Sequence, residues 1–195
     1  MPRAGLTPEV VARVAADLAD EHGWSQLTLA AVATTLGVRQ PSLYKHVTSL
    51  AALRRAVSLQ ATAELGDALT LAVAGRAGPD ALTHLAAAYR DYAHTHAGRY
   101  AASVVAPAEG DTDHIRVSQA VLATLVAVLR GYGITDGSDD ALHAIRALRS
   151  LLHGFVALES AGGFALALDL DESFTRMVAS FDAALRDGAP TASAR

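Results

Sequence analysis

Apolar residues recur at intervals of three and four along almost the whole chain, the spacing that places them on one face of an α-helix. The first such face carries Val11, Val14, Ala15 and Leu18, and the second carries Leu29, Val32, Ala33 and Leu36. Alternating runs of β-branched and aromatic residues, which are typical of strands, are absent from the sequence. The pattern predicts an all-α protein.

Capping residues and breakers divide this pattern into separate helices. Thr7 followed by Pro8 is a helix start, Thr28 and Ser49 are placed to cap later helices, and Gly37 suits the left-handed position after a helix end. The predicted helices cover approximately residues 8–22, 28–36, 41–47, 50–74, 79–96, 99–105, 112–132, 138–160 and 171–186.

The stretch from Leu36 to Val47, "LGVRQPSLYKHV", stops one helix and begins a very short one within about four residues. This spacing indicates a helix–turn–helix, whose second helix enters the major groove of DNA. With Leu43 and Val47 facing inward, the polar residues of this helix point outward. Gln40 and Lys45 are expected to read base edges, and Thr28, Ser42, Tyr44 and His46 to contact phosphate. Arg39 and Pro41, at the start of the same helix, complete the predicted DNA-binding set.

The charge distribution favours a polyanionic partner for the first part of the chain. The whole protein carries a net charge of −4, but the window from Ser25 to Ala63 contains no acidic residue and includes Arg39, Lys45, Arg54 and Arg55. DNA would therefore be attracted to the first part of the chain and repelled by the remainder.

Other features limit the remaining functions. The chain has no cysteine, which excludes disulfides and thiolate metal sites. The longest apolar run, residues 120–129, is too short to span a bilayer, and the first residues do not resemble a signal peptide, so a cytoplasmic protein without a membrane partner is expected. His94 and His96 are two residues apart and would diverge on a helix, so no metal site and no cofactor are predicted. No catalytic motif is present, and an enzyme is not expected.

The segment from about residue 8 to residue 57 resembles the DNA-binding domain of the TetR family of bacterial transcriptional regulators. The resemblance rests on the Leu36-Gly37-Val38 turn, on the Leu43-Tyr44 pair, on His46-Val47 and on Leu53, with no gap in the spacing between Thr28 and Leu53. The family usually has a lysine just after the cap of the fourth helix, where this chain has Leu50, and Arg54 or Arg55 is a possible replacement.

The resemblance implies an organisation for the rest of the chain. Residues 1–48 would form the DNA-binding domain, residues 49–187 a helical regulatory and dimerisation domain, and residues 188–195 a disordered tail. In the family the last two helices form a homodimer and the middle helices enclose a ligand. The helices near 138–160 and 171–186 would then form the dimer interface, and a pocket would lie between about Leu65 and Leu129.

Tyr89, Tyr92 and His96 are spaced i, i+3 and i+7 and would share one helix face, as the polar groups of an otherwise apolar pocket. Ordinary core packing explains the same spacing. The predicted function is a repressor released from a palindromic operator by a hydrophobic or aromatic effector. The alternative is a helical binding or enzymatic domain that retains a helix–turn–helix as a structural unit.

Overall fold

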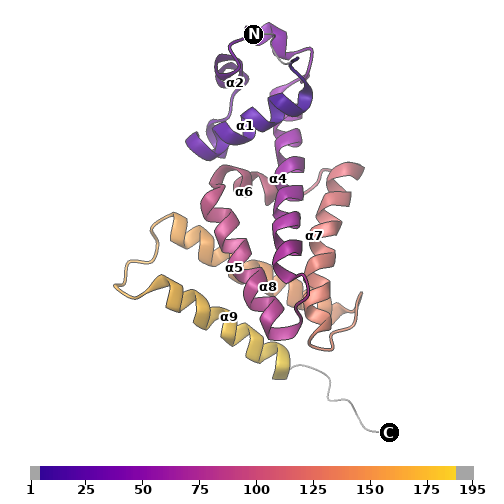
Figure 1. Cartoon of the computed structure of the whole chain (residues 1–195), viewed down its shortest axis with the longest axis vertical. Helices are drawn as coiled ribbons and strands as arrows, with labels where there is room; N and C mark the ends of the chain where they lie inside the picture. Colours follow the sequence, from indigo (N-terminus) through magenta and orange to yellow (C-terminus); the bar gives the residue numbers. More distant parts are fainter. Residues whose placement is uncertain (1–4, 188–195) are drawn as a thin grey trace. The chain divides into compact units, whose positions relative to one another are not determined.

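The computed structural model describes residues 5–187, and every regular element in that range is a helix (Figure 1). The predicted all-α class is thereby confirmed. The predicted tail at residues 188–195 lies outside the described residues. Within residues 5–187, none of the helices is both long enough and apolar enough to cross a membrane.

The helices begin and end close to the predicted positions, with a 3₁₀ turn, η1, between the first two. They are α1 (Pro8–His22), η1 (Trp24–Gln26), α2 (Leu29–Thr35), α3 (Gln40–Leu43), α4 (Leu50–Val73), α5 (Gly78–Thr95), α6 (Ala97–Ser103), α7 (Thr112–Arg130), α8 (Asp139–Ser160) and α9 (Leu170–Asp187).

The predicted caps at the first helices are present. The hydroxyls of Thr7, Thr28 and Ser49 accept hydrogen bonds from backbone N–H groups at 3.3, 3.2 and 3.0 Å. Helix α9 begins one residue before the predicted start. The Asp169 carboxylate caps it by accepting hydrogen bonds from the backbone N–H groups of Asp171 and Glu172 at 2.8 and 3.0 Å.

The chain divides into two compact units. The first comprises Met1–Gly66 and Thr95–Gln119, and the second comprises Asp67–His94 and Ala120–Arg195. Each unit is thus assembled from two separate stretches of sequence. These compact units do not test the predicted functional boundary after residue 48, between a DNA-binding and a regulatory domain. That boundary stays a prediction.

In the first unit the core is built from the inward faces of the first four helices. Val11, Val32, Leu43, Leu53 and Val57 are completely buried there, as the apolar periodicity predicts. Close packing of these side chains leaves few voids in the core.

Helix α6 packs directly on α1 in this unit (Figure 1). The approach is so close that a Cβ atom on Gly98 would overlap the backbone carbonyl of Ala19. Only glycine therefore fits at position 98.

A group of charged side chains joins the same two helices. The buried guanidinium of Arg99 is paired with Asp17 and Asp20 of α1, and its backbone N–H donates to Asp20 at 2.8 Å. Glu64 of α4 lies 3.4 Å from the Arg99 Nε atom. Burial lowers the pKa of Arg99, but the three carboxylates together raise it more, so the pKa lies above its ordinary value.

In the second unit α8 and α9 lie side by side and are joined by residues 161–169 (Figure 1). Phe155 is the centre of an aromatic cluster, with the ring of Phe164 at 4.9 Å and that of Phe174 at 5.1 Å. These distances are typical of favourable aromatic pairs. The loop between α8 and α9 is thus attached to the core through Phe164.

The family resemblance assigns a dimer interface to α8 and α9, which both carry many apolar residues. Most of them are buried within the single chain: Ile145, Leu148, Leu152, Phe155, Val156, Phe174, Val178 and Leu185. Periodicity identifies an apolar face but does not say whether the same chain or a second one covers it. A dimer interface must therefore rest on other residues.

The second unit also contains a buried polar pair. The Tyr132 hydroxyl donates to the Asp182 carboxylate at 2.6 Å, and both residues are buried. Burial, and then the hydrogen bond to Asp182, raise the pKa of Tyr132. We expect Tyr132→Phe to lower the free energy of unfolding by roughly 1.5–3 kcal/mol, because the buried carboxylate loses a donor. Urea unfolding measures the change in the free energy of unfolding, with the exposed Tyr44→Phe as the control. A loss of stability no larger than that of the control would contradict the prediction.

Candidate functional site

Helices α2 and α3 are joined by a tight turn at Gly37. Gly37 has a φ of 65°, and the Val38 N–H donates back to the carbonyl of Ala33 at 3.0 Å. This is the glycine-terminated helix end predicted from the sequence. Only four residues separate the end of α2 from Gln40, which is the geometry of a helix–turn–helix.

The α-helical part of α3 is shorter than predicted. It ends at Leu43, and residues 44–46 continue as turns in which the His46 N–H donates to Leu43 at 2.8 Å. The inward residues are nevertheless the predicted ones, since Leu43 and Val47 are both buried. Residues 44–46 thus follow the course of a helix closely enough to keep Leu43 and Val47 on the inward side, as predicted.

The predicted DNA-binding residues form one polar surface around these two anchors. Half of the Tyr44 surface is exposed. The other exposed members are Arg39, Gln40, Pro41, Ser42 and Lys45, while His46 is half-buried. Thr28 is exposed at the start of α2, where its hydroxyl already caps the helix. The placement is compatible with the predicted roles, which stay predictions.

The two arginines considered as replacements for the missing lysine have partners within the chain. Arg54 donates to the backbone carbonyl of Ser25 at 3.4 Å and lies over the Trp24 ring. Arg55 donates to both carboxylate oxygens of Asp111 at 2.5 Å. Arg55 is thus committed to a two-point ion pair, which argues against a free phosphate contact at this position.

The predicted ligand residues do not share one helix. Tyr89 and Tyr92 are buried on α5, but that helix ends at Thr95. His96 is the N-cap residue of α6 and its Nδ1 atom lies 3.3 Å from Asp20. The assumed continuous face is therefore interrupted one residue before His96, and a common ligand-binding role of the three residues stays a prediction.

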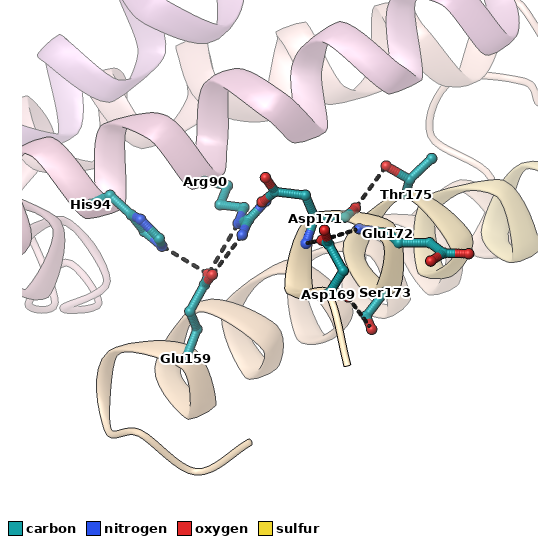
Figure 2. A network of polar contacts seen from close by, with 8 residues as sticks. All are labelled: Arg90, His94, Glu159, Asp169, Asp171, Glu172, Ser173 and Thr175. Atoms are coloured by element: carbon teal, nitrogen blue, oxygen red, sulfur yellow. Dashed lines mark hydrogen bonds and ion pairs between the residues drawn. The ribbon is translucent and has the colours of Figure 1, made fainter. Parts of the chain in front are cut away.

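A polar cluster on the second unit was not predicted (Figure 2). Arg90 of α5 donates to both oxygens of Glu159 on α8, at 3.0 and 2.5 Å, and pairs with Asp171 of α9 at 2.8 Å. A ring nitrogen of His94 lies 2.7 Å from Glu159. The guanidinium also lies over the ring of Phe174 at 4.9 Å. Arg90 thus joins three helices.

Beside this cluster lies an open groove with a volume of about 560 Å³. Its lining is mixed, with Ala87, Ala88 and Phe174 next to Asp91, His94 and Asp171. The cluster could not be predicted from the sequence, because Arg90 and Glu159 are 69 residues apart. The one local signal is that Arg90 and His94 are four residues apart, so that both can face a single carboxylate.

Because of the ion pair between Arg90 and Glu159, we expect the protein to lose stability in acid. Hydrogen bonds from Arg90 lower the pKa of Glu159 against the opposing effect of burial. A carboxyl whose pKa is lower in the folded state stabilises the fold fully above its unfolded value, about 4.3, and this contribution disappears as the pH falls through the folded value. We expect Glu159→Gln to cost roughly 1.5–3 kcal/mol at pH 7. The difference from the wild-type protein should shrink below about pH 4. Urea unfolding between pH 3 and pH 7 measures the difference in unfolding free energy between the variant and the wild-type protein. The exposed Glu21→Gln is the control. A difference that does not change with pH would contradict the prediction.

Comparison with known proteins agrees with the helix–turn–helix. A family model described as the tetracyclin repressor-like C-terminal domain matches residues 82–181. An uncharacterized HTH-type transcriptional regulator of Mycobacterium tuberculosis, Rv0681, is 42% identical over 176 residues, which cover 90% of this chain and 79% of that protein. A second uncharacterized HTH-type regulator, YobS of Bacillus subtilis, is 34% identical over 92% of this chain and 93% of its own length.

Solved structures share the fold at lower identity. BioQ of Mycobacterium smegmatis has a TM-score of 0.68 at 21% identity, with 94% of this chain and 99% of BioQ covered. A TetR variant from Acinetobacter baumannii in complex with minocycline has a TM-score of 0.71 at 21% identity, with 96% and 100% covered. The family model covers the regulatory half, and the two regulators match along nearly the whole chain. The chain therefore belongs to the TetR family of transcriptional regulators.

Proposed function

We propose that the protein is a homodimeric repressor that binds a palindromic operator and is released by a small hydrophobic or aromatic effector. The observation that carries the DNA-binding part is the polar surface around α3, in which Gln40, Tyr44 and Lys45 are exposed while Leu43 and Val47 fix the segment to the core. The acid-free window from residue 25 to residue 63 supports the same partner.

The DNA-binding part is tested with DNA from upstream of the protein's own gene. A gel-shift titration against this DNA and against a scrambled duplex of equal length should show specific binding, tighter by at least about 10³-fold. Equal affinity for both duplexes would contradict an operator-specific regulator.

The dimer is supported by a surface that residues 5–187 leave uncovered. On the outward side of α8, Leu151 and Leu158 are exposed beside the exposed small residues Ala147, Ser150 and Ala157. Small residues let a second helix approach closely, and exposed leucines beside them mark an interface. A two-fold dimer would place two copies of α3 on two half-sites of a palindrome.

We expect the protein to be a dimer in solution, with twice the chain mass of 20.2 kDa. Leu151→Glu combined with Leu158→Glu should shift it to the monomer, because two charges would be buried in each half of the interface. Leu71→Glu is the matched control, since Leu71 is exposed on α4 and not on α8. Light scattering at micromolar concentration decides, and a monomeric wild-type protein would contradict the proposal.

The effector is proposed from the composition of the regulatory part. Between Leu65 and Leu129 the chain is rich in Ala, Leu and Val, with Tyr89, Tyr92 and His96 as proposed polar contacts. A dimer reads two half-sites only when its two copies of α3 stand about 34 Å apart or a multiple of it. Helix α4 begins directly after the reading segment and is common to both units, so we propose it as the element that changes this spacing.

An effector releases the protein only if it binds better to the state in which the two copies of α3 do not match the spacing of the half-sites. Coupling free energies between two binding sites are typically about 1–3 kcal/mol. The test titrates hydrophobic and aromatic compounds into a preformed protein–DNA complex and measures thermal stability of the free protein in parallel. Compounds that stabilise the free protein strongly without lowering its DNA affinity would count against release by such an effector.

A further inference from the structure

The groove beside Arg90 has the size of a binding site for a small organic molecule. Its volume of about 560 Å³ lies within the range of about 300–1,000 Å³ that is typical of ligand pockets. All of its lining residues belong to α5 and α9 of the second unit. Tyr89, Tyr92 and His96, the predicted effector contacts, do not line it. The groove is therefore a separate candidate for a ligand site.

The charges around the groove are predominantly negative. Asp91 and Asp171 line it, and Glu159 binds the Arg90 guanidinium at its edge (Figure 2). Arg90 is the one arginine of the lining. Even with a proton on His94, these side chains keep one negative charge in excess. A cationic group is therefore attracted to the groove.

An anionic ligand finds its possible donors already in use. Arg90 binds Glu159 and Asp171, and the ring nitrogen of His94 lies 2.7 Å from Glu159. The start of a helix commonly binds anions through its free N–H groups. At the start of α9, however, the Asp169 carboxylate already accepts from two of these groups (Figure 2). A ligand carboxylate would have to displace one of the protein's own.

The carboxylates of the lining, in contrast, are available to a cation. Asp91 is exposed, and its side chain has neither an ion pair nor a hydrogen bond to any residue from 5 to 187. Asp171 pairs with Arg90 but keeps 84% of its side chain exposed. Ala87 lies one turn before Asp91 on α5, so an apolar and an acidic surface adjoin on one helix face.

We propose that this groove binds an organic cation with an apolar body, such as an aromatic amine salt. The ammonium group lies beside Asp91 and Asp171. The apolar body packs on Ala87, Ala88 and Phe174. A bare metal ion would leave this apolar part of the lining unused. The site goes beyond the proposed function, because it is separate from the effector contacts proposed there.

The test uses three compounds that share a naphthalene ring and differ in charge: 2-(1-naphthyl)ethylamine, 2-(1-naphthyl)ethanol and 1-naphthylacetate. Calorimetric titration of the full chain at pH 7.5 and low salt measures their dissociation constants. We expect the amine to bind about fivefold more tightly than the alcohol, the upper value for an exposed ion pair, and the carboxylate to bind most weakly. The preference for the amine should shrink in high salt, because salt screens exposed charges.

Asp91→Asn removes one carboxylate at nearly constant shape. It should bring the affinity for the amine to within about twofold of that for the alcohol and leave the affinity for the alcohol unchanged. Asp67→Asn is the matched control, since Asp67 is exposed on α4, outside the groove, and its substitution changes the net charge equally. This control should keep the ratio of the two dissociation constants.

Equal binding of the amine and the alcohol by the wild-type protein, including no binding of either at millimolar concentration, would overturn the proposal. An unchanged ratio in Asp91→Asn would also overturn it. An equal loss in Asp67→Asn would assign the preference to the net charge of the chain and not to the groove. Tightest binding of the carboxylate would show that Arg90 governs the groove instead. No DNA is present in these titrations, so their result is independent of the proposed function.

Discussion

Gly98→Ala is expected to lower the free energy of unfolding by about 3 kcal/mol, at the upper end of overpacking costs. The new Cβ atom would overlap the carbonyl carbon and oxygen of Ala19, which are backbone atoms and cannot turn aside. Helix α6 must therefore move away from α1, and the pairing of Arg99 with Asp17 and Asp20 is disturbed with it. Urea unfolding of the purified variant measures the loss.

The matched control lies one residue earlier on the same helix. Ala97 is exposed, and Ala97→Val adds more volume than Gly98→Ala without meeting α1, so it should change stability by less than about 0.5 kcal/mol. If Gly98→Ala were as stable as this control, the close approach of the two helices would not exist in solution.

Substitutions on α3 are expected to have an equally large effect on DNA binding. Gln40→Ala should relax the preference at one base pair of each half-site, by about 1–3 kcal/mol per contact, or roughly 2–6 kcal/mol for a dimer on both half-sites. Tyr44→Ala should weaken binding to every sequence, because a phosphate contact carries no sequence information. Fluorescence anisotropy with the operator and with single-base variants of it separates the two outcomes.

Gln119→Ala provides the control for both, since Gln119 is exposed, uncharged and on α7. It should leave the affinity for all duplexes unchanged. Operator affinity that survives both Gln40→Ala and Tyr44→Ala would exclude α3 as the element that reads DNA.

The helices were predictable because their signals are local. A hydroxyl cap, a terminal glycine and an apolar stripe act within four residues, which is why Thr28, Gly37 and Leu43 could be placed from the sequence. The extent of the α-helical part of α3 was less predictable. Its last residues are held by turn hydrogen bonds whose geometry depends on how Val47 packs, and that is decided by the tertiary structure.

The candidate sites were predicted less well, for a physical reason. Arg90, Arg99 and Arg55 bind carboxylates 69, 79 and 56 residues away, and no periodicity connects such positions. Polar residues at a turn could be assigned to DNA because their neighbours identify the motif.

The close contact of α6 with α1 has a consequence for exchanging parts between regulators of this kind. Residues 95–119 belong to the same compact unit as the helix–turn–helix, although they follow it by about fifty residues in the chain. A chimera that joined this N-terminal segment to the α6 of another parent would tolerate no side chain at the position of Gly98, because its Cβ atom would overlap the backbone of Ala19. The transplantable module is therefore discontinuous, and its two pieces have to be taken from the same parent.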